Sequence, residues 1–168
     1  ASDQDDAMGG ARIAAVLSEP GLGGNAVDLH DRLKGLERDR SPRGRDASKL
    51  AERWARAAGG GSGGEADAGL LLAEAFPERI ARARGKPGEV LLASGRGAFL
   101  DPTEHMAREP WLAVAELGGG DARDRIRLAA ALDGATLETD LAHRIEVEDR
   151  LAREPSGKPV IRRIRRIG

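Results

Sequence analysis

The sequence predicts an α+β fold in which an N-terminal helical subdomain precedes a small antiparallel β-barrel with one inserted helix. Apolar residues recur at helical spacing in the first part of the chain, and after residue 88 their period changes to two, which is typical of strands. The run GGGSGG at residues 59–64 separates the two patterns. We therefore predict a helical accessory segment over residues 1–58, a glycine-rich linker over 59–64, and a kinked helix plus barrel over 65–168.

Charge and composition exclude several classes of protein. The chain has 27 Lys and Arg against 28 Asp and Glu, a formal net charge of −1, so any contact with nucleic acid must come from a local basic patch. It has no cysteine, which excludes disulfides and thiolate metal sites and is typical of the reducing cytoplasm. No apolar run approaches the ~20 residues that span a bilayer, and no secretion signal opens the chain. We expect a cytoplasmic protein with no membrane contact.

Both ends of the sequence look cut. The chain starts with Ala1, and its apolar-basic pattern is unfinished at Gly168. We expect an excised piece of a larger protein, truncated within its C-terminal part.

The first helices follow from capping residues and apolar stripes. Residues 11–17 form a helix that Pro20 and the following glycines end. Asn25 is expected to cap the next helix, with Ala26, Leu29, Leu33 and Leu36 on one face. Ser41 and Pro42 are a cap and a first-turn residue for a third helix, whose predicted apolar stripe contains Ala47, Leu50, Ala51, Trp54 and Ala58.

The glycine run 59–64 favours a flexible boundary, although a loop within a single domain also fits it. The next helix is predicted over residues 65–84. Leu72, Phe76 and Ile80 keep helical spacing across Pro77, which indicates one kinked helix.

Strands are expected after the turn at Pro87 and Gly88. Residues 90–93 and 98–100 flank the turn SGRG as a hairpin, and further strands are predicted over 111–117, 125–132, 144–151 and 160–167. Ile145, Val147 and Leu151 are expected to point inward, and Asp133 to cap a short helix up to about His143. This order of strands and helix predicts an OB-like Greek-key barrel.

No catalytic or cofactor site is encoded. Neither glycine-rich stretch has the GxxxxGK[ST] spacing that holds a triphosphate. His30, His105 and His143 lack metal-ligand spacing, and no serine lies in a nucleophile motif. We predict no catalytic residue, no metal and no bound cofactor in this chain.

Basic residues are the candidates for binding. A strand places adjacent arginines on opposite faces, so about half of those near the C-terminus could line one groove. They could contact phosphates or, alternatively, form a basic edge strand that resists aggregation. An arginine at the tip of the first hairpin could likewise contact a phosphate or serve solubility. The candidates are Arg96, Lys158, Arg162, Arg163, Arg165 and Arg166.

Aromatic residues are scarce. Trp54, Phe76, Phe99 and Trp111 lie on predicted helical stripes or strands, and there is no tyrosine. Single-strand binders of the OB type stack bases on exposed aromatic rings. Any nucleic-acid contact is therefore expected to use charge and backbone shape.

Several segments carry a family resemblance: RIAAVLSEPGLGG, the helix VDLHDRLKGLERDRSPRGRDASKLAERWARA, LLLAEAFPERIARARG, LLASGRGAFLDP, EPWLAVAEL and RIRLAAALD. In this order they resemble the region after the motor domains of HrpB-type bacterial ATP-dependent helicases, relatives of the DEAH-box RNA helicases. The resemblance covers nearly the whole chain after residue 10. Its most specific block runs from FPERIARARG to GRGAFL.

The resemblance implies a helical accessory domain followed by an OB-like barrel that helps guide single-stranded nucleic acid, with RNA as the expected ligand. It implies that ATP and Mg²⁺ bind the motor domains, because no motor residue maps onto this chain. Two alternatives stay open: a structural module that docks on the motor domains or a partner protein, and an independent OB-fold binding protein.

Overall fold

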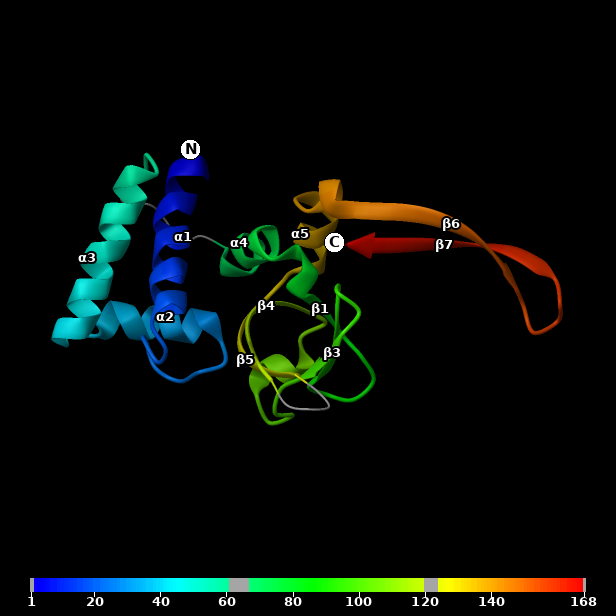
Figure 1. Ribbon diagram of the computed structural model, residues 1–168, viewed down its shortest axis with the longest axis horizontal. Helices are drawn as coiled ribbons and strands as arrows, with labels where there is room; N and C mark the ends of the chain where they lie inside the picture. Colours follow the sequence, from blue (N-terminus) through cyan, green and yellow to red (C-terminus); the bar gives the residue numbers. More distant parts are fainter. Residues whose placement is uncertain (1, 61–66, 120–123, 168) are drawn as a thin grey trace.

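The computed structural model describes residues 2–60, 67–119 and 124–167. Figure 1 shows three parts side by side: a group of helices at the N-terminal end, a small barrel flanked by two short helices, and a two-stranded ribbon that projects away from both. The predicted α+β class, with helices followed by a small barrel, is confirmed. No described helix is long and apolar enough to cross a membrane.

The first three helices are α1 (Ser2–Ser18), α2 (Leu29–Arg38) and α3 (Pro42–Ala57). The Ser41 cap is confirmed, since its hydroxyl accepts from the Gly44 N–H at 3.1 Å. The predicted Asn25 cap is wrong: Asp28 caps α2 and accepts from the His30 N–H at 2.9 Å. The helix starts later because the preceding backbone is extended along the barrel, where the Ala129 N–H donates to the Val27 carbonyl at 2.9 Å.

Small residues form the buried stripe of α3. Ala47, Ala51 and Ala55 are buried, whereas Trp54, predicted to lie on that stripe, is 38% exposed. A row of alanines at i, i+4 and i+8 lets α3 pack closely on α1, and this leaves the larger indole outside.

One apolar cluster joins the helices to the outer wall of the barrel. It contains Ile13 and Val16 of α1, Leu72 of α4 (Ala68–Ala75) and Leu128 from the barrel. Residues 61–64 of the predicted linker lie outside the described residues, and Gly59, with φ of +80°, ends α3. The domain boundary at this position stays a prediction.

The kinked helix predicted over 65–84 is wrong. Helix α4 stops at Ala75, a 3₁₀ turn (η1, Pro77–Arg79) follows, and the chain then enters strand β1 (Ile80–Ala83). Pro77 cannot donate the next helical hydrogen bond, and Phe76 has already left the helix at φ −134° and ψ 64°. Ile80 lies in this strand and is buried because its side chain packs in the apolar cluster between the helices and the barrel wall.

Five strands close the barrel in the order β1-β2-β3-β5-β4. The remaining four are β2 (Glu89–Leu92), β3 (Gly97–Phe99), β4 (Trp111–Gly118) and β5 (Asp124–Ala131). The hairpin around SGRG is confirmed as β2 and β3, and all neighbours are antiparallel except β3 and β5. A 3₁₀ turn, η2 (His105–Arg108), separates β3 from β4 and buries Met106 in the barrel interior.

The last two strands lie outside the barrel. Helix α5 (Gly134–Thr139) and the 3₁₀ turn η3 (Ala142–Arg144) follow β5 and lead into β6 (Ile145–Arg153) and β7 (Pro159–Ile167), which pair only with each other. Their predicted place in the barrel is wrong because β1 pairs with β4 and leaves no free edge. Val147 and Leu151, predicted to point inward, are 59% and 78% exposed. We call residues 145–167 the arm.

Candidate nucleic-acid interface

The arm is one of the basic stretches of the chain. It contains seven Arg and Lys against four Asp and Glu, in a protein of net charge −1. Figure 1 shows it extending from α5 into solvent, with the turn between its strands far from the barrel. Its side chains are therefore open to a ligand along most of its length.

The pairing of β6 with β7 divides the predicted arginines between two faces. Arg163 lies opposite Asp149 and Arg165 opposite Val147, on one face of the arm. Arg162 lies opposite Arg150, and Arg166 opposite Glu146, on the other face. Two of the four arginines lie on each face, as the alternation predicted.

Some of these charges are already paired within the protein. Arg163 holds Asp149 with two hydrogen bonds of 2.9 and 3.0 Å, and these bonds lower the pKa of the Asp149 carboxyl. Arg165 lies 3.2 Å from the Glu138 carboxylate. Arg162 and Lys158 are exposed and, within the described residues, have no salt-bridge partner. The same holds for Arg153, and these three charges are available to a ligand on the arm.

Arg96 lies in the turn between β2 and β3, as predicted. Its side chain is 69% exposed, and its Nη2 atom lies 2.6 Å from Oδ2 of Asp124, whose side chain is only 9% exposed. Asp124 begins β5, and β5 runs parallel to β3 at this point. Arg96 therefore joins the turn to β5 and offers only the rest of its guanidinium to a ligand.

The end of β7 and the outer wall of the barrel enclose a hollow of about 470 Å³. We call it the basic hollow, and its lining residues are Ile80, Arg82, Leu91, Leu92, Ala93, Ser94, Gly95, Trp111, Arg165, Arg166 and Ile167. It brings Arg165 and Arg166 beside the turn that carries Arg96. Lys158 directly precedes the other end of β7, about 25 Å away at ~3.3 Å per residue.

Two lining residues, Arg82 and Trp111, were missed as site residues at the sequence level. Arg82 fell within the predicted kinked helix, and Trp111 was assigned to core packing. The signal that would have found Arg82 is the alternation of Ala81, Arg82, Ala83 and Arg84 after Pro77, which fits a strand.

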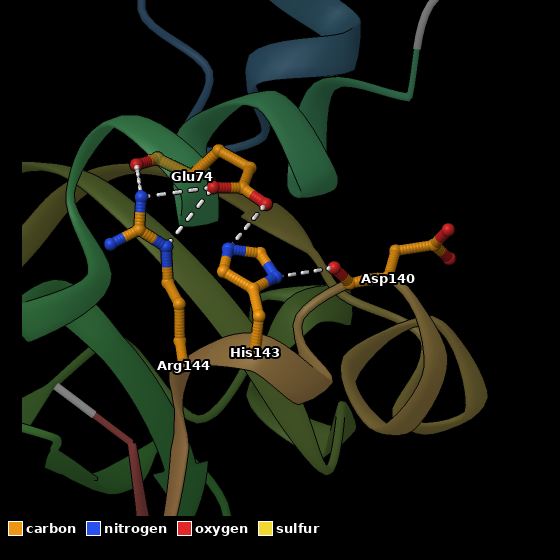
Figure 2. A network of polar contacts seen from close by, with 4 residues as sticks. All are labelled: Glu74, Asp140, His143 and Arg144. Carbon is orange, nitrogen blue, oxygen red and sulfur yellow. Dashed lines mark hydrogen bonds and ion pairs between the residues drawn. The ribbon is translucent and has the colours of Figure 1, made fainter.

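The base of the arm is fastened to α4 by a polar network, shown in Figure 2. Arg144 donates from Nε to the Glu74 carboxylate at 3.0 Å and from Nη2 to the Glu74 carbonyl at 3.2 Å. The Nε2 atom of His143 lies 3.6 Å from the same carboxylate, and its Nδ1 lies 3.1 Å from the Asp140 carbonyl. This network fixes where β6 starts, and hence where the returning β7 meets the barrel.

One histidine lies beside carboxylates. His105 of η2 has its Nε2 atom 3.3 Å from Asp28 and 4.0 Å from Asp31 at the start of α2. These groups lie within 4.8 Å of one another. Because Asp28 already caps α2, we interpret the contact as a tie between the helices and the barrel, and the predicted lack of a metal site stays a prediction.

Comparisons with known proteins identify the relatives of this chain. No protein-family model matches it. It is 37% identical over 135 residues to the ATP-dependent RNA helicase HrpB of Escherichia coli strain K12, a match that covers 79% of this chain and 16% of that protein.

Two solved structures match the fold over the full length of this chain. The crystal structure of the E. coli DExH-box NTPase HrpB has a TM-score of 0.81 at 32% identity, and that of the E. coli DEAH/RHA helicase HrpB has a TM-score of 0.80 at 28% identity. The chain spans 20% of each of those chains. The fold match covers the whole chain and the sequence match covers 79% of it, and together they show that the chain belongs to the HrpB-type helicases as a C-terminal accessory region.

Proposed function

We propose that this region guides single-stranded nucleic acid, RNA in preference to DNA, for the ATP-dependent helicase of which it is a part. The observation that carries the proposal is the exposed basic surface of the arm and the basic hollow in a chain of net charge −1. The preference for RNA follows from the name of the relative, an ATP-dependent RNA helicase.

The contacts would be made to the phosphate backbone. Guanidinium groups bind phosphate oxygens with paired hydrogen bonds, and each neutralised phosphate adds affinity that salt weakens. Arg96 and the basic residues of β7 would supply these contacts, with Arg162 and Lys158 the least compensated. Binding would then depend on charge and little on base sequence.

The chemistry of ATP is assigned to other parts of the helicase. We propose that ATP and Mg²⁺ bind the motor domains, on which this region packs, and that the region by itself has no motor-type triphosphate site and does not hydrolyse ATP. The basis is the lack of a phosphate-binding loop in its sequence.

A salt titration tests the proposal directly. The 168-residue chain is titrated into a fluorescein-labelled single-stranded RNA of 12 nucleotides, and anisotropy is followed from 50 to 300 mM KCl. We expect the logarithm of the binding constant to fall linearly with the logarithm of salt. A binding constant that does not change with salt would exclude binding through phosphate contacts. The same titration with DNA of the same sequence measures the preference for RNA.

The matched variants compare two pairs of arginines. Arg162→Ala with Arg166→Ala removes two charges from one face of the arm, and we expect the salt slope to fall by up to about 2. Arg53→Ala with Arg56→Ala removes two exposed charges from α3. An equal effect of both pairs would show that only net charge matters and would remove the arm from the proposal.

A second function is favoured by the apolar residues of the arm. Val147, Leu151 and Ile161 are 59%, 78% and 72% exposed, and the register places them on the same face. Such a face is suited to docking on a protein surface, such as the motor domains. This function is supported if the chain binds no single strand at 50 mM salt but restores activity when added to a truncated motor.

A further inference from the structure

We infer that the basic hollow binds one nucleotide unit, with its phosphate on the arginines and its base against Trp111. The inference deepens the proposed function, on which it rests, by assigning the point where a single strand is held by more than charge. In this hollow an indole and several guanidinium groups line one surface.

Strand pairing determines which residues form the barrel side of the hollow. Arg82 of β1 lies directly between Trp111 of β4 and Leu91 of β2. Its neighbour Ala81 is fully buried in the barrel interior, so Arg82 and its two partners lie on the outer face. The row therefore presents a charged side chain with an apolar residue on either side.

The end of β7 supplies the other wall. Arg165, Arg166 and Ile167 line the hollow opposite the barrel. Arg165 forms an ion pair with Glu138. Arg166 adds to the hydrogen bond from Arg150 in lowering the pKa of the Glu148 carboxyl. Arg82 has no salt-bridge partner among the described residues, and no lining residue is acidic. An anion would thus meet the uncompensated charge of Arg82 first.

Trp111 gives the hollow its second kind of contact. Its side chain is half-buried, and no described residue accepts a hydrogen bond from its indole N–H. Gly134, which does not line the hollow, lies beside one edge of the indole, since a Cβ placed on it would be in ordinary contact with Cδ1 and Nε1 at 3.6 Å. An indole with a free N–H beside guanidinium groups suits a base with its phosphate, and a hollow of about 470 Å³ is within the ~300–1,000 Å³ of ligand sites.

Tryptophan fluorescence provides a local readout. The chain has two tryptophans, so Trp54→Phe leaves Trp111 as the single reporter. This variant is titrated with 5′-AMP, with adenosine and with inorganic phosphate at 50 mM salt. We expect 5′-AMP to quench Trp111 emission to saturation, whereas adenosine binds much more weakly and phosphate binds without quenching.

Two arginines two positions apart test the assignment. In the Trp54→Phe background, Arg82→Ala should raise the Kd for 5′-AMP about tenfold, because a hydrogen bond to a charged group is lost. Arg84→Ala removes an equal charge from a residue that does not line the hollow, and it should change the Kd less than twofold. Equal Kd values for the two variants, or no quenching by 5′-AMP, would overturn the inference.

The single-nucleotide site and the proposed guiding function can be excluded independently of each other. If RNA binds with a steep salt slope but 5′-AMP does not quench Trp111, the single-nucleotide site is excluded and guiding by the arm survives. If 5′-AMP quenches Trp111 and Arg82→Ala abolishes this, the site is supported even when the 12-nucleotide RNA shows no salt-dependent binding.

Discussion

The arginines of the folded body, by which we mean the helices and the barrel, differ from those of the arm in what they contact. In the body, the Arg79 guanidinium donates to the Ala115 carbonyl at 2.8 Å and lies over the Phe76 ring, 4.9 Å from its centre. The buried Arg32 donates to the Ala26 carbonyl at 2.7 Å. Arg162, by contrast, is exposed on the arm, which projects away from the described helices and barrel in Figure 1.

This difference indicates at which arginines an effect on ligand binding can be measured without an effect on folding stability. A guanidinium that satisfies buried carbonyls is part of the fold, and its removal leaves acceptors without donors. An arginine on the arm can be replaced with little change in folding. Binding measurements on arm variants therefore report on contacts with the ligand, whereas variants in the body mix contact with stability.

The largest contrast is expected from one substitution made in both regions. Leu128 of β5 is fully buried and Leu151 of the arm is 78% exposed. Leu128→Ala should lower the free energy of unfolding by about 2–5 kcal/mol, because it leaves a cavity. Leu151→Ala should change it by less than about 0.5 kcal/mol. Urea unfolding followed by circular dichroism measures both, and similar losses would show that the arm is buried in solution.

Two glycines give a smaller contrast. Gly88 and Gly157 have φ of +83° and +84°, so an alanine is strained at either position. At Gly88 the new Cβ would also lie 2.4 Å from the Leu100 carbonyl oxygen, whereas at Gly157 no atom lies within 4 Å. Gly157→Ala should cost about 1 kcal/mol, felt only in the arm, and Gly88→Ala at least about 2 kcal/mol. Thermal unfolding of the two variants compares the costs, and equal melting temperatures would contradict the tight packing at Gly88.

The substitution Arg96→Ala tests whether Arg96, predicted to contact a ligand, also stabilises the fold through its ion pair with Asp124. Removing Arg96 leaves the nearly buried Asp124 without its partner, so Arg96→Ala should cost about 1 kcal/mol of stability. Arg162→Ala should stay within about 0.5 kcal/mol. Urea midpoints decide between them. If Arg96→Ala is as stable as the wild type, its charge is free for a ligand, as the sequence suggested.

The sequence predicted local features better than their assembly. The Ser41 cap, the SGRG hairpin and the strands after it depend on neighbouring residues, and all were found. The segment after Pro77 was mistaken for a helix because the spacing of Leu72, Phe76 and Ile80 fits a helix as well as it fits a helix end followed by a strand. Which strands close the barrel depends on pairing between distant residues, and so the joining of Arg82 with Arg166 could not be read from spacing.

The smallest expected effect is the response of the arm to acid. The hydrogen bonds from Arg163 lower the pKa of Asp149 from its ordinary 3.8, and the hydrogen bond from Arg150 lowers the pKa of Glu148 from its ordinary 4.5. A carboxyl whose pKa is lower in the folded state stabilises that state above its unfolded pKa, and this contribution is lost as pH falls through the folded value. The arm should therefore loosen as the pH falls from about 4.5 to below 3.8.

An NMR titration of the Asp149 side chain measures this directly, since its signal is local and does not respond to Asp39 or Asp101, whose pKa values hydrogen bonds from Ser41 and Thr103 also lower. The midpoint for Asp149 should lie below 3.8, and Arg163→Ala should return it toward that value. Arg162→Ala, on the opposite face, should leave it unchanged. If both variants shift the midpoint equally, the general charge of the arm acts on Asp149, and the two faces do not behave as separate surfaces for binding.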